Sequence, residues 1–485
     1  MVDVQWPVVA TSRGRVGGVA EGTVVAFRGI PYAASPVGAL RFAAPRPHPG
    51  WSGVRDATAP GPSVPQPASR LEAVMGPRVP DWNEDGCLTL NVWTPAETLP
   101  PGAEPRPVLV WWHGGGFSSG SSGWDWYDGA RLAALGGIVV ITANYRLGPL
   151  GYLHLPEIGA VNPGVRDQIA VLRWVRENIV AFGGDHDAVT VGGQSAGAHS
   201  ATALAPETRD LVRRMIAQSG PGNIGAQEVA EADDCAAAYL RFLGVTRPEA
   251  LRGLPVERLL AAYGQLAAER ARPGGTAPPM YPVLGGPGMP RPPLQAIADG
   301  ALGDKDVLLG TTEDEMTAFC AFDPAVRTLT RDDVQTLFTA RAEDYGRYAA
   351  RRPGAAPVRL LADLLTDESF AAPAAGTAAH RAAQGTPAYL YRFTRRPPDD
   401  PHDLGACHCA DLPFLFGTFD AYPDAPMLGG VDGHDHALAQ AFGGALTAFT
   451  ATGSPNGEGL ATWRPYTPDP GTDIMYFGPP FFDPK

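Results

Sequence analysis

One serine of this 485-residue chain stands in a pattern that is typical of a nucleophile. The pentapeptide Gly193-Gln-Ser195-Ala-Gly197 follows an apolar, β-branched run and precedes an alanine-rich run that is compatible with a helix. A strand that turns abruptly into a helix exposes a serine at the corner, and small flanking residues permit the strained turn. The pattern therefore predicts that Ser195 attacks an acyl carbonyl.

A second copy of the same spacing, Gly116-Phe-Ser118-Ser-Gly120, competes with this prediction. The chain contains 59 glycines, so chance matches to the pentapeptide are expected. Ser118 leads into another Gly- and Ser-rich stretch, which is loop composition and supplies no helix. The surrounding sequence therefore favours Ser195 over Ser118.

A serine hydroxyl is a weak nucleophile at neutral pH, so it needs a base that is oriented by an acid. In folds with this corner, the chain order is serine, acid and then histidine. Of the histidines that follow Ser195, His408 lies on a loop after an expected strand that ends at Phe393. The acid should follow an earlier strand, where Glu313, Asp314 and Glu315 stand together. The chemistry alone does not choose among these three, and such a cluster is also typical of a solvated loop.

Backbone N–H groups must stabilise the carbonyl oxygen as it gains negative charge. The segment His113-Gly-Gly-Gly-Phe117 directly follows an expected strand, and its glycines allow a close approach to the substrate. We therefore predict an oxyanion hole that is formed by the N–H groups of Gly115, Gly116 and Ala196.

The elements that must position these groups indicate an α/β fold with a large, mostly parallel sheet covered by helices on both faces. A small N-terminal antiparallel sheet of hairpins is expected over residues 8–33, and irregular structure over 36–80. Residues 183–187 read as a loop, and helical insertions over the active site are expected at about 225–300 and 325–385. Residues 1–485 are predicted to form a single folded unit, because there is no repeat or long linker. The expected strands span 87–93, 107–112, 137–143, 188–194, 213–220, 306–310 and 387–393, and a helix is expected over 167–182.

Charge and composition exclude several classes of protein. The net charge of -13 opposes binding to nucleic acid, and it either favours neutral or cationic substrates or serves only solubility. No run approaches the length of a membrane span, and the first residues have no secretory signal pattern. Five sparse cysteines have no disulfide-framework spacing, which favours a reducing compartment and a cytoplasmic location.

Ordered motifs along nearly the whole chain resemble the type-B carboxylesterases, most closely the bacterial members, and the resemblance implies their α/β-hydrolase fold. The motifs include Phe27-Arg-Gly-Ile-Pro-Tyr-Ala33, Asn144-Tyr-Arg-Leu-Gly148, the serine corner, the segment Gly405 to Gly417, and Thr452-Gly-Ser-Pro-Asn-Gly457.

The resemblance selects residues that the chemistry left open. It implies Glu315 as the catalytic acid, supports His408 as the base, and suggests Ser219 as a partner of the acid. It also implies two structural ion pairs, Arg41 with Glu84 and Arg146 with Asp167.

This chain departs from the family pattern at several positions. Met316 stands where the family usually has glycine, and Gln194 stands where glutamate is commoner. Val64 replaces the cysteine that secreted members pair with the equivalent of Cys87, so Cys87 is expected to be a free thiol. Trp82 lies too close to Cys87 to match the choline-binding tryptophan of cholinesterases, which disfavours choline esters.

The sequence thus predicts a cofactor-free serine carboxylesterase that acts on a small ester through an acyl-enzyme. The same triad could act on carbamates, amides or lactones, and a non-catalytic recognition domain of the same fold is the alternative of another class. Cys407-His408-Cys409 lacks a second ligand pair, so no metal is expected. The protein is predicted to be a monomer or a weak homo-oligomer, with no membrane or nucleic-acid partner.

Overall fold

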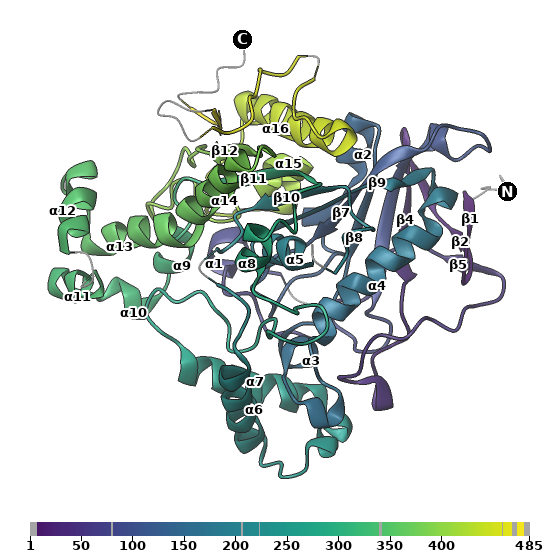
Figure 1. Cartoon of the computed structure of the whole chain (residues 1–485), viewed down its shortest axis with the longest axis horizontal. Helices are drawn as coiled ribbons and strands as arrows, with labels where there is room; N and C mark the ends of the chain where they lie inside the picture. Colours follow the sequence, from purple (N-terminus) through teal and green to yellow (C-terminus); the bar gives the residue numbers. More distant parts are fainter. Residues whose placement is uncertain are drawn as a thin grey trace.

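The computed structural model describes residues 7–78, 81–204, 207–222, 224–338, 342–457, 459–467 and 473–479. Within these residues the chain forms one large sheet with the strand order β13-β12-β11-β10-β9-β7-β8-β6-β4-β3, and a small sheet with the order β1-β2-β5 (Figure 1). The strands are β1 (Val8–Thr11), β2 (Gly14–Gly17), β3 (Val19–Glu21), β4 (Val24–Pro31), β5 (Val54–Asp56), β6 (Thr89–Pro95), β7 (Arg106–Trp112), β8 (Val139–Ala143), β9 (Gly184–Gln194), β10 (Arg214–Gln218), β11 (Asp306–Thr312), β12 (Tyr389–Phe393) and β13 (Ile474–Phe477).

Helices cover the large sheet on both faces, as predicted. The α-helices are α1 (Glu72–Met75), α2 (Ala130–Gly136), α3 (Gly148–Tyr152), α4 (Pro163–Asn178), α5 (Ala196–Leu204), α6 (Val229–Leu243), α7 (Val256–Arg270), α8 (Pro293–Ala298), α9 (Thr317–Cys320), α10 (Pro324–Arg327), α11 (Arg331–Leu337), α12 (Ala342–Arg351), α13 (Pro357–Thr366), α14 (Ala372–Ala383), α15 (Leu412–Phe416) and α16 (Gly433–Thr452). Single turns of 3-10 helix are η1 (Gly38–Leu40), η2 (Ala96–Thr98), η3 (Asp125–Tyr127), η4 (Pro156–Ile158), η5 (Ile179–Phe182), η6 (Pro248–Gly253) and η9 (Phe419–Ala421), and η8 (Asp367–Ala371) is a π-helix.

The continuous apolar runs of the central strands arise because both faces of the sheet are buried. In β7, Val108 and Trp112 pack into the core shared with α4 and α5. Leu109 and Trp111, which point to the opposite face, pack into the core shared with α2 and α16. Alternate side chains of one strand therefore hold two helical layers.

The sheet is parallel from β13 to β8, and the strands beyond β8 are antiparallel. Parallel strands end at the same edge, so the loops after β7, β9, β11 and β12 gather there. These are the loops in which the sequence placed the glycine run, Ser195, the acid and His408.

The N-terminal prediction was partly wrong. Only β1 and β2 form a hairpin of the small sheet, whereas β3 and β4 extend the large sheet by pairing β4 with β6. The third strand of the small sheet, β5, comes from the stretch expected to be irregular, and it pairs in parallel with β2. The small sheet is therefore mixed, because a strand distant in sequence completes it.

Two further expectations differ from the structure. The segment 183–187 is not a loop, because β9 already begins at Gly184 and bends as it pairs with β7. The strand β13, at the edge of the large sheet, was not predicted. Its residues Ile474–Phe477 form a short run among proline-rich neighbours, so the sequence carries little period-2 signal there.

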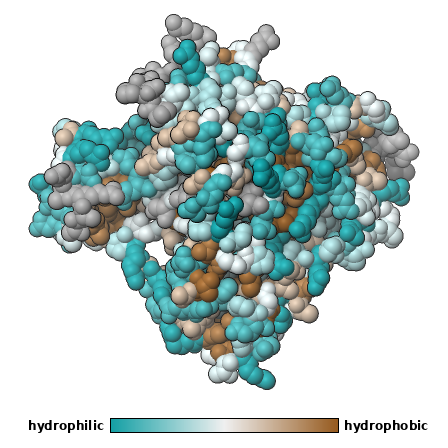
Figure 2. Space-filling view, in the orientation of Figure 1, coloured by the Kyte–Doolittle hydropathy of each residue, from teal (hydrophilic) through white to brown (hydrophobic). Residues whose placement is uncertain are grey.

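The two predicted insertions are helical. In Figure 1, α6 and α7 form the lower end of the molecule and α10 to α13 form its left side, while α14 returns to pack on β11 and β12. Figure 2 shows that this face of the molecule is largely hydrophilic, with only small separate hydrophobic areas. None of the helices in the described ranges is long and apolar enough to cross a membrane.

Both ion pairs implied by the family resemblance are present. Arg41 Nε lies 2.6 Å from Glu84 Oε1, and Arg146 Nε lies 2.8 Å from Asp167 Oδ2. The second pair is fully buried, with Asp167 also accepting the backbone N–H of Arg146 at 3.0 Å. This pair fixes the loop after β8 to helix α4, directly behind the site edge of the sheet.

Asp167→Ala is expected to lower the free energy of unfolding by about 3–5 kcal/mol, because it leaves the Arg146 guanidinium buried without its counter-charge. Glu97→Ala serves as the matched control, since Glu97 pairs with Arg106 at 2.8 Å while its side chain is 70% exposed. Glu97→Ala should lower the free energy of unfolding by less than about 1 kcal/mol. Urea unfolding of both variants measures the difference, and equal losses would contradict the structural role of the buried pair.

Candidate active site

Ser195 lies at a left-handed corner between β9 and α5, as the sequence predicted. Its φ is +58°, a strained value for a residue with a side chain. The corner is possible because a Cβ on Gly197 would lie 2.0 Å from the carbonyl oxygen of Trp112. Only glycine therefore lets α5 start so close to the end of β7. The corner is tied to β10, because Ser195 N donates to Gln218 O at 2.9 Å.

His408, predicted from its position in the chain, lies in direct contact with Glu315, the acid that the resemblance selected. His408 Nδ1 and Glu315 Oε2 are 2.5 Å apart, and both side chains are completely buried. The other oxygen of Glu315 accepts the backbone N–H of Thr312 at 2.7 Å, which fixes the carboxylate. The rings of Phe319 and Phe370 each lie 5.2 Å from the His408 ring. The imidazole is thus held between two aromatic side chains with its Nδ1 facing an acid.

The other two acids of the cluster have different partners. Glu313 lies at the surface and pairs with Arg396 at 3.1 Å. Asp314 is buried and pairs with Arg352 at 2.9 Å, with Arg396 at 2.9 Å, and with Arg359. Its Oδ2 also accepts the N–H of Ala406 at 3.0 Å. Asp314 therefore anchors the loop of His408, and Glu315 is the one of the three that contacts the imidazole.

Gln194 makes a contact that sequence reasoning missed. Its Nε2 lies 3.1 Å from His408 Nε2. Because Nδ1 of His408 faces Glu315, Nδ1 carries the proton, and Nε2 accepts from the Gln194 amide. The residue type at position 194 was noted as unusual, but nothing in the sequence indicated that it reaches the histidine.

The glycine loop after β7 lies close to Ser195, because a Cβ built on Gly114 would lie 3.3 Å from Ser195 Cβ. Gly115 has a φ of +107°, and a Cβ there would lie 2.1 Å from the Ser119 carbonyl oxygen. Among the described residues, no carbonyl or side chain accepts the N–H of Gly115, Gly116 or Ala196. All three residues line the same pocket as Ser195, so the three donors predicted for the oxyanion hole lie beside one cavity.

His113 supports this loop from beneath. Its ring stacks on Tyr145 with the centroids 4.5 Å apart, and its Nδ1 lies 2.8 Å from Gly114 O. Burial lowers the pKa of His113 to about 4, so the ring is neutral at physiological pH. A neutral ring with Nδ1 protonated donates to Gly114 O and fixes the start of the loop.

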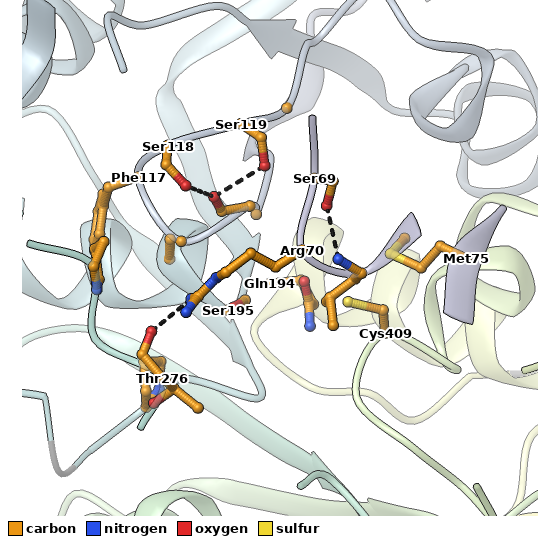
Figure 3. A pocket seen from close by; sticks show the side chains of 18 of the residues that line it. Ser69, Arg70, Met75, Phe117, Ser118, Ser119, Gln194, Ser195, Thr276 and Cys409 are labelled. Atoms are coloured by element: carbon orange, nitrogen blue, oxygen red, sulfur yellow. Dashed lines mark hydrogen bonds between the residues drawn. The ribbon is translucent and has the colours of Figure 1, made fainter. Parts of the chain in front are cut away.

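The pocket above Ser195 is mainly apolar. Trp124, Trp126 and Phe319 line it together with Phe370 from the second helical insertion, and Pro278 from the first. Figure 3 shows Ser195 and Gln194 at its base, Phe117 at one side, and Arg70 extending across it toward Thr276. Arg70 was not predicted, because it lies in the proline-rich stretch that has no periodicity.

Two predicted or competing residues do not take the expected place. Ser219 follows β10, but its hydroxyl has no hydrogen-bond partner among the described residues, so a bond to Glu315 is not observed. Ser118 lies on the glycine loop, where its hydroxyl donates to Gly115 O at 3.2 Å.

In the described part of the chain, no three His, Cys, Asp or Glu side chains are grouped to hold a metal ion. Cys87 is buried and unpaired, and Val64 is also buried in the core.

The mixed sheet with helices on both faces, and the strand–serine–helix corner at its edge, define an α/β-hydrolase. The model of the carboxylesterase family matches residues 5–476, and the chain belongs to this family of carboxylic ester hydrolases.

Named relatives cover almost the whole chain. It is 39% identical to a phenmedipham hydrolase of Pseudarthrobacter oxydans, with 96% of this chain and 93% of the relative covered. It is 37% identical to a para-nitrobenzyl esterase of Bacillus subtilis, with 95% and 92% covered. A crystal structure of a carboxylesterase of Geobacillus stearothermophilus superposes with a TM-score of 0.83 at 35% identity, with 97% and 96% covered.

A further buried acid, Asp411, lies near Glu315 and His408. Its Oδ2 accepts the Tyr391 hydroxyl at 2.9 Å, and its Oδ1 has no partner among the described residues. Burial, together with the charge of Glu315, raises the pKa of Asp411 to about 7. In the unfolded chain this carboxyl ionises at its ordinary, lower pKa. Between pH 4 and about 7 the unfolded state therefore loses a proton that the folded state keeps, and stability falls as the pH rises.

Asp411→Asn removes this titration and keeps an acceptor for Tyr391. We expect the stability of the variant relative to the wild type to increase from about pH 4 to about pH 7, by about 1.4 kcal/mol per pH unit. Thermal unfolding of both proteins across this range measures it. Asp420→Asn, at an exposed carboxylate, is the control for loss of one charge. A difference between Asp411→Asn and the wild type that is constant with pH would contradict the raised pKa.

Proposed function

We propose that Ser195, His408 and Glu315 are the catalytic triad of this carboxylesterase, and that the N–H groups of Gly115, Gly116 and Ala196 form its oxyanion hole. The observation that carries the proposal is the buried contact of 2.5 Å between His408 and Glu315, beside the strained corner that carries Ser195. A carboxylate buried so completely is costly to desolvate, so its contact with an imidazole close to Ser195 supports a catalytic use.

The reaction proceeds in two acyl transfers. Ser195 Oγ bonds to the ester carbonyl carbon as His408 Nε2 takes the hydroxyl proton, and the carbonyl oxygen becomes an oxyanion held by the three N–H groups. His408 then returns this proton to the alcohol as the ester C–O bond breaks. Water repeats the sequence on the acyl-enzyme and releases the acid. Glu315 stabilises the imidazolium in each half.

Gln194 must give way before the first proton transfer. Its amide occupies His408 Nε2, the atom that accepts the serine proton. A neutral amide yields this position more readily than a carboxylate, because a carboxylate would form a charge-assisted bond to the imidazolium. We infer that Gln194 holds the imidazole in place in the resting enzyme and releases it as substrate enters.

The substrate class is proposed from the pocket. Aromatic side chains and few polar groups line it, which supports esters with an apolar or aryl portion. The relative named for phenmedipham hydrolysis supports the alternative of a carbamate substrate for the same triad. Amides and lactones stay predictions, and the intact set of Ser195, His408 and Glu315 argues against a purely recognition role.

The finer statements on partners and location are also proposals. We propose a cofactor-free enzyme that works as a monomer or a weak homo-oligomer in the cytoplasm. The five buried, unpaired cysteines support a reducing compartment.

Ser195→Ala is expected to abolish release of p-nitrophenol from short-chain acyl esters, because no other hydroxyl lies at the corner. A fluorophosphonate probe should label the wild type and not the variant. Hydrolysis by the wild type at the rate of the variant, or labelling of both, would contradict Ser195 as the nucleophile.

The acid is tested in the same assay with two matched variants. Glu315→Gln should lower kcat roughly 10³- to 10⁴-fold, whereas Glu313→Gln, two residues away and paired with Arg396, should change kcat little. A large loss of kcat in Glu313→Gln with little loss in Glu315→Gln would show that Glu315 is not the catalytic acid.

Gln194→Glu is expected to shift the acid limb of the kcat/KM profile upward by about one pH unit. A carboxylate beside His408 Nε2 favours the imidazolium, so the neutral base appears only at higher pH. Gln194→Leu is the control, since it removes the amide without adding charge and should not raise the limb. Measurement of kcat/KM from pH 5 to 9 distinguishes them, and equal shifts in both variants would show that charge is not the cause.

A further inference from the structure

Arg70 is the one charged side chain among the described residues that line the pocket of Ser195. It reaches from the loop before α1 across the pocket, where its Nη2 donates to Thr276 O at 2.6 Å (Figure 3). Thr276 belongs to the loop after α7, so the arginine joins two segments that are far apart in the sequence.

The guanidinium lies next to the loop that holds the developing oxyanion. A Cβ built on Gly116 would lie 3.3 Å from Arg70 Nη2. Arg70 is solvent-exposed and lines the same pocket as Ser195. A group on a bound substrate can therefore reach it while the carbonyl lies at Ser195.

No carboxylate neutralises this cation within the described part of the chain. Its pocket contains no Asp or Glu, and no ion pair of Arg70 is observed there. Glu315 is committed to His408 and Thr312, and position 194 carries a neutral amide. The guanidinium still has N–H donors to spare after one bond to Thr276.

The net charge of -13 gives the opposite expectation for substrate preference, but it acts at longer range. At physiological ionic strength, charges more than about 8 Å away across water are largely screened. Inside a largely apolar pocket, the Arg70 guanidinium dominates the electrostatic interaction with a bound ligand. Guanidinium groups with free donors bind carboxylates in a bidentate geometry.

We propose that Arg70 binds a carboxylate carried by the substrate, so that this esterase prefers esters bearing a carboxylate near the scissile bond over neutral esters of the same shape. The inference rests on the proposed catalytic role of Ser195. The carboxylate can belong to the acyl part, as in a monoester of a dicarboxylic acid, or to the alcohol part, as in an ester of a hydroxybenzoate.

Two substrate pairs test the two sources. In the acyl arm, the p-nitrophenyl monoester of glutaric acid is compared with p-nitrophenyl hexanoate. In the alcohol arm, para-acetoxybenzoate is compared with para-isopropylphenyl acetate. The readout is the ratio of kcat/KM for the anionic ester to that for the neutral ester, measured on the full chain at neutral pH.

Arg70→Met should lower this ratio about 10- to 100-fold in at least one arm, because it removes a charge-assisted hydrogen bond. Arg70→Lys should retain part of the ratio, since it keeps the charge and loses the bidentate geometry. Arg15→Met, at an exposed arginine on β2 outside the pocket, removes the same charge and should leave the ratio unchanged.

If Arg70→Met leaves this ratio unchanged in both arms, the inference is overturned. The same holds if kcat/KM falls equally for the anionic and the neutral ester, because Arg70 then serves only as a structural link to Thr276. Should Arg70→Met not fold, the wild type alone decides. Its ratio must fall as sodium chloride is raised, and a ratio independent of salt overturns the inference. Failure of the proposed catalytic role looks different, because then neither ester is hydrolysed in a Ser195-dependent manner.

Discussion

The active-site edge depends on one steric constraint, the approach of helix α5 to the end of strand β7. Gly197 lies so close to the Trp112 carbonyl that no side chain fits, and Ser195 is forced to a φ of +58°. The strain is held by the sheet on both sides, because β9 pairs with β7 and β10. The same approach brings the glycine loop after β7 next to the serine. A side chain at position 197 would therefore displace Ser195 and the predicted oxyanion donors together.

Three buried carboxylates around this edge differ in their surroundings, and the surroundings set what each can do. Asp314 contacts three arginines and acts as an anchor for the His408 loop. Glu315 faces one imidazole and one backbone N–H, so it can stabilise a positive charge that appears there. Asp411 accepts a hydrogen bond from a tyrosine hydroxyl, and burial, together with the charge of Glu315, raises its pKa to about 7. Residue type alone does not separate these three, whereas their partners do.

The sequence predicted the parts of the fold that carry strong local patterns. The buried parallel strands, the helix expected over 167–182, and the strand–serine–helix corner follow from apolar runs and spacing, although α4 begins earlier, at Pro163. The acid was chosen by family resemblance, since Glu313, Asp314 and Glu315 are equivalent until arginines from distant segments are placed. The strands β5 and β13 were missed because each is short and is stabilised by partners far away in the sequence. Arg70 and the contact of Gln194 with His408 were missed for the same reason: tertiary contacts, which have no local signal, create them.

The charge of the whole chain and the charge of its pocket have opposite signs, and this follows from how the acids are used. The acids near the site are turned inward, toward His408, Tyr391 and structural arginines, and none of the described acids lines the cavity. Because residue 194 is glutamine, the corner that carries Ser195 adds no negative charge to the pocket either. Arg70 therefore supplies the field that a substrate meets beside Ser195, although acidic residues outnumber basic ones along the chain as a whole. The proposed preference for anionic esters thus follows from the one charged side chain that lines the described part of the pocket.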